Sequence, residues 1–295
     1  MTTLMQTLFN GLALGSVYAL ISLGFSLVHK ASGAVNFAHG SLLLLGGYLV
    51  AVLHGPLGFA GALAVAAAGT ALAAVLEGLL LRGARGESPA VPTIMTIGID
   101  ILLFTELARR IGADVLDLGD PWGARTVRLA GVTVPQARAA SLLAAVVLVA
   151  AFLAAFRWSR WGLAMRVSSS DREAAALMGV RGGRQRAGAW ALAGVLAAVA
   201  AVFLTAFPTP GLSSTTGQVA LKAFPAAVVG GLGSVGGALA GSLLVGVAEA
   251  ASAGYQQQLS ALGSGLSDVA PYLVMVLVLV ARPQGLLGSK ETSRV

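Results

Sequence analysis

The sequence predicts an all-α protein, a polytopic transmembrane helical bundle with broken or re-entrant helices, forming one membrane domain over residues 1–295. Apolar residues make up 57% of the chain and charged residues 11%, with a mean hydropathy of +0.85, which leaves too little charged surface for a soluble protein of this length. Apolar stretches near the length that a membrane helix needs, about 20 residues, recur from end to end. The net charge of +7 therefore indicates orientation signals and contact with membrane lipid, and no nucleic acid partner is expected.

The predicted spans follow one another along the whole chain. They cover residues 5–28, 35–53, 59–81, 93–107, 141–156, 187–207, 220–249 and 269–281, the seventh being broken in its middle. The first is expected to be a retained span, because no positive segment precedes it and it is longer than the core of a signal peptide. Between the fourth and fifth spans, Val132 and Val134 alternate between turn residues and predict a short strand or hairpin.

The distribution of basic residues predicts the orientation. Short cytoplasmic loops are enriched in Lys and Arg, and the loop at residues 157–186 carries seven arginines against Asp171 and Glu173. Alternation from this loop places the N-terminus outside. If the broken segment enters and leaves on one side, the basic C-terminus lies in the cytoplasm. Arg109 and Arg110, on the predicted outer side, are exceptions to the rule.

The break in the seventh span is a glycine cluster. Gly231, Gly233 and Gly236 fit the pattern Gly-x-Gly-x-x-Gly, but a dinucleotide-binding fingerprint needs a preceding strand in a soluble βαβ unit, and both flanks here are membrane-like. We predict instead a broken helix, close helix packing, or both, inside the protein, where irregular backbone is shielded from lipid. Gly11 and Gly15 are four residues apart on the first predicted span and likewise predict a close approach of two helices.

A second interruption, around Asn36 and His39, lies near the other end of the chain. Paired interrupted segments indicate the substrate pathway of a transporter, and on a helix Asn36 and His39 would share a face from which both can hydrogen-bond a substrate. Asp100, near the middle of an apolar span, is a further candidate as a pathway residue or proton carrier. The alternative for these residues is that they only tie helices together. The substrate-pathway candidates are Asn36, His39, Gly40, Asp100, Gly233 and Ser234.

Two further acids have basic neighbours on the same span. Glu77 lies near Arg82, and Glu106 lies near Arg109 and Arg110, so both acids are expected in ion pairs at the membrane surface. No catalytic residue, metal site or cofactor is expected, since the chain has three histidines and no cysteine. The sequence also lacks a Gly-x-x-x-x-Gly-Lys-Ser/Thr loop, so any energy from ATP comes from a partner.

Several separate motifs, in the right order, resemble the permease subunits of branched-chain amino acid ABC importers of the high-affinity, inner-membrane type. They are NGLALGSVYAL at 10–20, NFAHG at 36–40, GLGSVGGA at 231–238 and RPQGLLG at 282–288. The resemblance extends along most of the chain. It implies a subunit of the bacterial inner membrane that moves a solute and catalyses no covalent chemistry.

The resemblance also gives the arginine-rich loop a role. ABC importer permeases carry a cytoplasmic Glu-Ala-Ala-x-x-x-Gly segment, a short coupling helix seated in a groove of the ATPase subunit. Glu173, Ala174, Ala175 and Gly179 match it, although the downstream Ile-x-Leu-Pro of the longer form is absent. The implied partners are two ATPase subunits that bind ATP, a second homologous permease subunit and an extracytoplasmic binding protein. That protein would deliver leucine, isoleucine or valine, and related permeases are associated with urea, short amides or aromatic acids.

Two other function classes are weighed against this one. A self-sufficient, proton-coupled secondary transporter would use Asp100 and His39 as carriers, and an uncoupler would stop its transport. A membrane scaffold that transports nothing would depend on Asn36 and His39 for assembly alone.

Overall fold

The computed structural model describes the chain except residues 1, 85–89, 124, 130–131, 171–174, 176, 180–181, 207–210, 259–264 and 289–295. The helices are α1 (Thr2–Ser32), α2 (His39–Leu80), α3 (Ala90–Ile111), α4 (Gln136–Trp158), α5 (Arg160–Ser170), α7 (Gly182–Thr205), α8 (Thr216–Leu221), α9 (Ala223–Gly230), α10 (Val235–Gly254) and α11 (Leu266–Ala281). A 3-10 turn, η1 (Leu81–Ala84), follows α2. The predicted helical bundle is confirmed.

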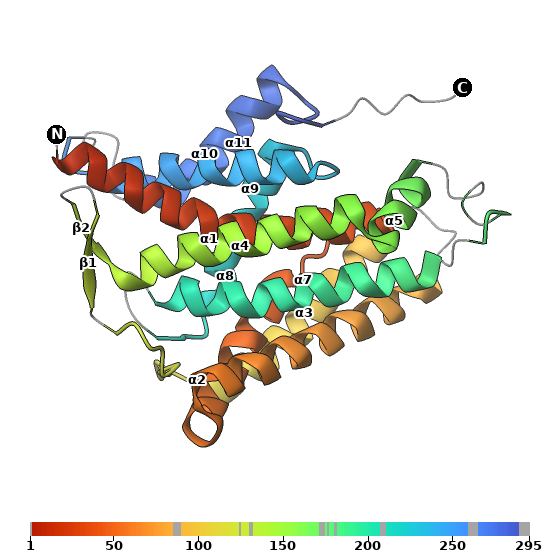
Figure 1. Ribbon diagram of the computed structural model, residues 1–295, viewed down its shortest axis with the longest axis horizontal. Helices are drawn as coiled ribbons and strands as arrows, with labels where there is room; N and C mark the ends of the chain where they lie inside the picture. The colour runs from red at the N-terminus through yellow and green to blue at the C-terminus, as the bar shows by residue number, and fades with distance from the viewer. Residues whose placement is uncertain are drawn as a thin grey trace.

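The long helices run side by side, and the bundle has two distinct ends (Figure 1). The hairpin end holds the start of α1, the start of α4 and the strands β1 (Thr126–Leu129) and β2 (Val132–Pro135), which pair antiparallel with Val127 opposite Val134. The strand expected from the alternating valines is therefore present. The α5 end holds the end of α4, α5 and the start of α7.

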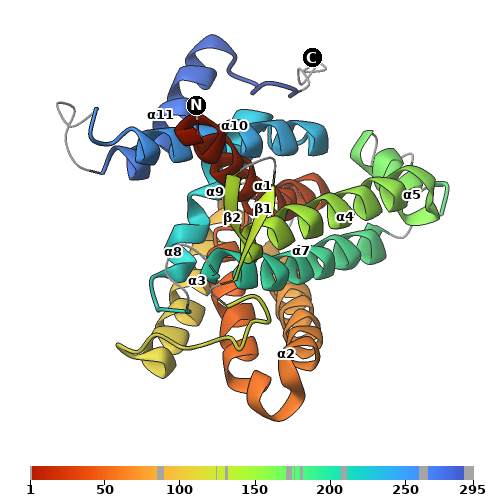
Figure 2. The same cartoon turned by 60° about the vertical axis from the view of Figure 1, so that its left-hand side comes forward.

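Within the described residues, six helices are long and apolar enough to cross a membrane: α1, α2, α3, α4, α7 and α10. Helix α2 has 42 residues, so at 1.5 Å per residue its length of about 63 Å is twice the thickness of a hydrocarbon core. It reverses at Gly58, which has a φ of 69° just after Pro56, between the second and third predicted spans. Figure 2 shows the two arms of α2 lying side by side.

Helix α1 occupies the centre of the bundle, whereas α3 and α4 lie at its edge. The most apolar stretch of α1 is 89% buried inside the protein, against 11% for α3 and 17% for α4. Helix α1 carries apolar side chains on every face, as expected of a helix enclosed by other helices. The predicted first span is therefore the core helix of the fold.

Helices α1 and α10 are in backbone contact along what we call the α1–α10 seam, formed by Gly11, Gly15, Ser242 and Gly246. A Cβ added at Gly11 would lie 2.7 Å from the Cα of Val247, and one at Gly15 would lie 2.9 Å from the carbonyl oxygen of Ser242. Real Cβ atoms do not approach this closely, so the predicted role of these two glycines is confirmed. At Gly233, in contrast, an added Cβ would meet nothing within 4 Å.

The broken seventh span is built from three helices, α8, α9 and α10. The chain reverses at Gly231, whose φ is 95°, and the Nζ of Lys30 near the end of α1 lies 3.5 Å from the carbonyl oxygen of Gly233. The segment therefore runs from the hairpin end to the level of Lys30 and back. Its second arm, α10, has 20 residues and is long and apolar enough for a full crossing, longer than the half-helix expected from the sequence.

The C-terminal RPQGLLG motif supports this reversal. The amide of Leu286 donates to the carbonyl of Val229 at 2.7 Å, and the amide of Leu287 donates to that of Gly230 at 3.2 Å. The last carbonyls of a helix have no partner inside the helix. The C-terminal segment thus supplies hydrogen-bond donors to the last carbonyl groups of α9.

We expect Gly15→Leu to lower the free energy of unfolding by about 1–3 kcal/mol, because the added side chain must push α10 away from α1. The measurement is the melting temperature of the protein in detergent. Gly98→Leu is the matched control, since an added Cβ at this exposed position on α3 would meet nothing within 4 Å. Equal melting temperatures for the two variants would contradict the close contact.

Candidate functional site

The interruption between α1 and α2 is a tight turn stabilised by Asn36. Helix α1 ends before Gly33, whose φ is 80°, and Asn36 Oδ1 accepts the amide of Ala38 at 2.9 Å. An asparagine that bonds the amide two residues on favours a turn over a helix. Asn36 therefore precedes α2, and the expectation that Asn36 and His39 share a helical face is wrong.

The same turn is held by a buried carboxylate. Asn36 Nδ2 donates to Glu77 Oε2 at 3.1 Å, and Glu77 is only 3% exposed. Glu77, which we expected beside Arg82, instead points into the protein from the second arm of α2. Because an acid in the membrane is costly unless it is paired or protonated, this contact ties the turn firmly to α2.

Helix α3 satisfies the backbone of the turn. The Oγ1 of Thr96 accepts the amide of Phe37 at 3.1 Å and lies 3.1 Å from the carbonyl of Val35, while the Oγ1 of Thr93 accepts the amide of Val35 at 3.3 Å. Irregular backbone at membrane depth needs such internal partners. No motif or spacing in the sequence pointed to these threonines.

The other candidates of this region are packed inside the protein. The ring of His39 is fully buried 4.8 Å from that of Phe25. Asp100 accepts a hydrogen bond from Ser41, and Gly40 lies so close to α8 that an added Cβ would be 2.7 Å from the carbonyl of Gly217. The contacts of Asp100 and Gly40 favour helix ties, whereas neither ring nitrogen of His39 has a hydrogen-bond partner among the described residues. A direct role in the substrate pathway stays a prediction for all of them.

Gly233 and Ser234 lie apart from this turn, at the reversal before α10. Ser234 is the N-cap of α10, and its Oγ accepts the amide of Gly237 at 3.1 Å. Gly233 offers its carbonyl to Lys30. Each contact gives its residue a structural role. A role in the substrate pathway remains a prediction for both residues.

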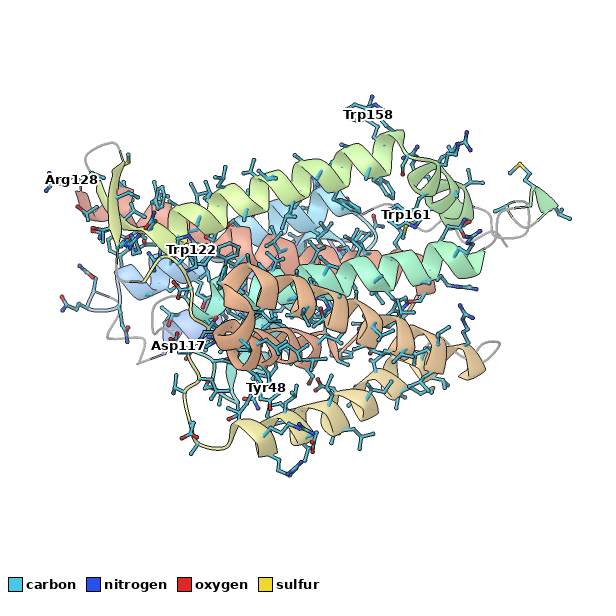
Figure 3. The ribbon with its side chains drawn as sticks, turned by 60° about the horizontal axis from the view of Figure 1, so that its bottom comes forward. Tyr48, Asp117, Trp122, Arg128, Trp158 and Trp161 are labelled. Atoms are coloured by element: carbon cyan, nitrogen blue, oxygen red, sulfur yellow. The ribbon has the colours of Figure 1, made fainter. Side chains whose placement is uncertain are left out.

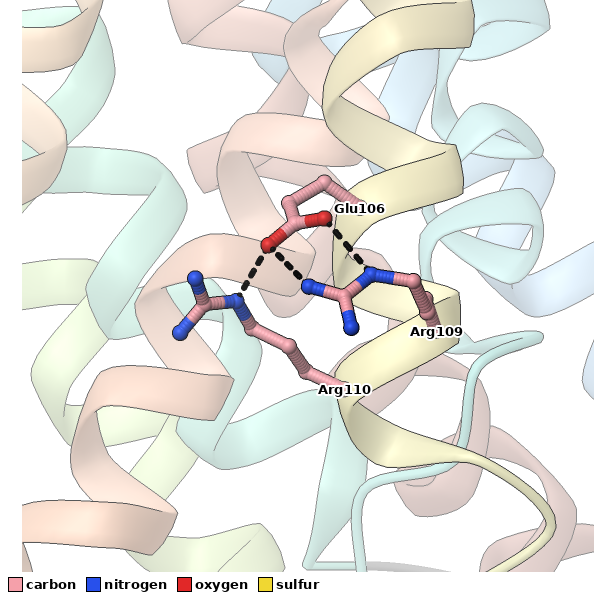
Figure 4. Close-up of polar contacts among 3 residues, drawn as sticks. All are labelled: Glu106, Arg109 and Arg110. Atoms are coloured by element: carbon pink, nitrogen blue, oxygen red, sulfur yellow. Dashed lines mark hydrogen bonds and ion pairs between the residues drawn. The ribbon is translucent and has the colours of Figure 1, made fainter.

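Arg109 and Arg110 form an ion-pair cluster with one acid (Figure 4). Glu106 accepts two bonds of 2.9 Å from Arg109 and one of 2.6 Å from Arg110, as the sequence predicts. All three side chains are exposed on the last turns of α3. Glu106 therefore offsets part of the positive charge of Arg109 and Arg110.

A cavity of about 550 Å³ opens among the helix ends at the hairpin end; we call it the hairpin-end cavity. Residues of α1, α4, α7, α8, α10 and α11 line it, and its charged lining residues among those described are Arg138, Lys222, Glu249 and Asp268. Tyr18 donates to Glu249 Oε2 at 2.7 Å. The Nζ of Lys222 lies 2.5 Å from Asp268 Oδ1 and 3.7 Å from Glu249 Oε1.

Below this cavity, toward the α5 end, small polar side chains join three helices. Ser242 donates to the Oγ of Ser22 at 3.0 Å, and Ser22 donates to the carbonyl of Ala223 at 2.9 Å. Ser22 lies about one helical turn beyond Tyr18, and Ser242 about two turns before Glu249. These serine hydrogen bonds therefore hold α1, α9 and α10 together on the side of the charged residues that faces the α5 end.

The segment that resembles a coupling helix is described only in part. Glu173 and Ala174 lie outside the described residues, whereas Ala175 is buried and Gly179 has a φ of 78°. Between them, Leu177 is 90% exposed and Met178 is 67% exposed. Large apolar side chains this exposed, beside an arginine-rich loop, form a surface suited to a protein partner.

Tryptophans lie at both ends of the bundle (Figure 3). Trp158 points away from the end of α4 and is 79% exposed, with Trp161 next to it on α5. Trp122 lies at the opposite end, before β1. Aromatic residues favour the two membrane–water interfaces, so this placement fits a bundle whose long axis crosses the membrane.

Sequence reasoning missed the hairpin-end cavity. In the sequence Glu249 is an acid beside an apolar span, but nothing there links it to Tyr18, which is 231 residues away. No spacing rule links residues so far apart in the chain. The one available signal was the unusual presence of Lys222, Glu249 and Asp268 at the borders of apolar segments.

Residues 7–279 match the protein family described as the branched-chain amino acid transport system / permease component. The chain is 32% identical to the high-affinity branched-chain amino acid transport system permease protein LivH of Salmonella typhimurium, over 99% of this chain and 97% of that protein. It is 31% identical to LivH of Escherichia coli K12, with the same coverage. It is 32% identical to BraD of Pseudomonas aeruginosa, over 99% and 98% of the two chains.

One solved structure also matches: PsaBC from Streptococcus pneumoniae in complex with Fab. The match covers 95% of this chain and 89% of that one, at 13% identity and a TM-score of 0.40. A likeness this distant supports no argument about the present chain.

We expect Asn36→Ala to lower the free energy of unfolding by about 1–3 kcal/mol, because it leaves the buried carboxylate of Glu77 without this donor. In a double-mutant cycle, Asn36→Ala/Glu77→Ala should cost less than the sum of the two single changes, with a coupling of about 0.5–3 kcal/mol. Melting temperatures of the four proteins measure it. Additive costs would contradict the tie.

Proposed function

The chain belongs to the family of branched-chain amino acid transport permease components, and we propose that it carries leucine, isoleucine, valine or a related small polar solute across the membrane. Members of this family are permeases of ABC importers, transport proteins rather than enzymes, and the hydrolysis of ATP belongs to separate subunits. The present chain is accordingly a multi-pass permease of the bacterial inner membrane.

The observation that carries the proposal is the extent of the family match. It spans residues 7–279, and the relatives align over nearly their full length. The alternative of a proton-coupled secondary transporter finds no support, since the relatives are permease proteins of ABC transport systems.

We propose further that the complete importer contains two ATPase subunits, a second homologous permease subunit and an extracytoplasmic binding protein. The α5 end would face the cytoplasm and the hairpin end the outside. The arginines at the α5 end support this orientation, with Arg157, Arg160, Arg184 and Arg186 among the described residues. The N-terminus would then lie outside and the C-terminus inside.

The exposed pair Leu177 and Met178 would dock on an ATPase subunit. Gly179, with its positive φ, ends the short turn that presents them. Glu173, Ala174, Ala175 and Gly179 match the coupling segment of ABC importer permeases, and the exposed pair lies within that segment. Burying two large apolar side chains gives a small docking surface an apolar centre, which is where binding energy concentrates.

We expect Leu177→Ser/Met178→Ser to weaken association with the ATPase by about 2 kcal/mol or more, roughly 30-fold, because the apolar centre of the contact is lost. Leucine-stimulated ATP hydrolysis in lipid discs should fall with it. Copurification of the candidate ATPase with the wild-type chain and the variant measures the association.

Leu57→Ser is the matched control, since Leu57 is 49% exposed beside the reversal of α2 and lies in a different part of the sequence. Its association with the ATPase should match that of the wild type. Failure of the wild-type chain to associate with any ATPase would overturn the proposed function, whereas unchanged association of the double variant would overturn only the docking residues.

A further inference from the structure

The charges of the hairpin-end cavity balance. Arg138 and Lys222 contribute two positive charges, and Glu249 and Asp268 contribute two negative ones. The side chains of Lys222 and Glu249 are only 19% and 13% exposed. Charged groups within membrane segments are costly and typically face a bundle interior or a water-filled pathway, where they serve function.

A structural tie alone does not explain this arrangement. Ion pairs buried for stability are often no better than apolar residues of similar volume. Here the charged groups instead line an open space of about 550 Å³, which is within the range of small-molecule sites. The space is large enough for a small solute and several waters.

The rest of the lining is largely apolar. Leu14, Val17, Phe203, Leu204 and Val219 contribute side chains to the cavity. A site with an apolar wall and a few convergent polar groups is the usual form of a pocket for a small ligand. The apolar wall excludes ions that carry no apolar part, and the charges disfavour a wholly apolar ligand.

We propose that the hairpin-end cavity binds a zwitterionic amino acid with an apolar side chain during its transport by this subunit. Glu249, held by Tyr18, receives the α-ammonium group, and Lys222 and Arg138 receive the α-carboxylate. The apolar wall receives the side chain. This inference rests on the proposed transport function and assigns a site to it.

The geometry around Glu249 supports this assignment. Tyr18 bonds Oε2 of the carboxylate, while Lys222 lies 3.7 Å from Oε1, beyond the distance of a good hydrogen bond. An ammonium group can therefore bond Oε1 without breaking the contact with Tyr18. Lys222 is already paired with Asp268 and can turn toward the carboxylate of the ligand, so no net charge is buried.

The location also fits a substrate site. The cavity lies at the hairpin end, which faces outward in the proposed orientation, and the contacts of Ser22 and Ser242 close the bundle beneath it. A ligand bound beside Tyr18 would rest above this closure. Movement of α10 relative to α1 would change both the hydrogen bond between Ser242 and Ser22 and the position of Glu249.

The first test is binding of radiolabelled L-leucine to the copurified importer in lipid discs, without binding protein, in nucleotide-free and ATP-bound states. We expect saturable binding in at least one state. Glu249→Gln and Lys222→Met should each weaken it by about tenfold to a hundredfold, as for the loss of a charged hydrogen bond. Glu106→Gln, in the exposed ion-pair cluster outside the cavity, is the control and should bind as the wild type does.

Analogues test the recognition of both charges. 4-Methylpentanoate lacks the ammonium group of leucine and 3-methylbutylamine lacks its carboxylate, so neither should compete with L-leucine at equal concentration. Competition by both compounds would show an apolar pocket without zwitterion recognition and would overturn the proposal.

A second measurement does not depend on the charge variants folding. Because the chain has no cysteine, Val219→Cys in the cavity lining and Thr133→Cys, at an exposed position of β2, each introduce a single thiol. L-Leucine should slow modification of the thiol at position 219 by a small methanethiosulfonate reagent and leave that at position 133 unchanged.

Equal modification rates with and without L-leucine, in an assembly that still shows leucine uptake when the binding protein is added, would overturn the cavity site while leaving the proposed function intact. Absence of ATP-dependent uptake by the wild-type assembly would overturn the proposed function itself. Leucine binding that Glu249→Gln and Lys222→Met leave unchanged would also overturn the assignment.

Discussion

The close contact along the α1–α10 seam is the constraint on which much of the structure depends. Gly11 and Gly15 let the backbone of α10 lie directly against α1, and Gly246 faces them from the other helix. Without this approach the short serine bridge between Ser22 and Ser242 would not form. In a membrane, where lipid is as apolar as the helix surfaces, close packing and hydrogen bonds of this kind drive helix association.

The same seam sets the chemistry of the hairpin-end cavity. Tyr18 follows Gly15 by about one turn and Glu249 follows Gly246 by about one turn, so the contact between the glycines brings the phenol and the carboxylate within hydrogen-bond distance. Lys222 approaches from the end of α8 and completes the charged group. A cavity with balanced charges thus arises where small residues upstream allow two helices to meet.

The two interruptions of the helices illustrate a second constraint. Each leaves backbone groups without partners inside a helix, and the protein supplies these partners from elsewhere in the chain. Thr93 and Thr96 serve the turn before α2, whereas Leu286 and Leu287 serve the end of α9. Irregular backbone at membrane depth is stable only when its polar groups find partners inside the protein. The distant RPQGLLG motif has this structural role at the end of α9.

The sequence alone determined the class of protein, the helical bundle, the reversal near Gly58 and the close packing at Gly11 and Gly15, because composition, segment length and residue size act locally. The resemblance in separate motifs led to the family that the comparisons then showed. The tertiary structure alone decided that Asn36 pairs with Glu77 and that Tyr18 and Lys222 meet Glu249 in a cavity. These pairs join segments far apart in the chain, and local patterns of hydropathy specify which residues enter the membrane but not which helices become neighbours.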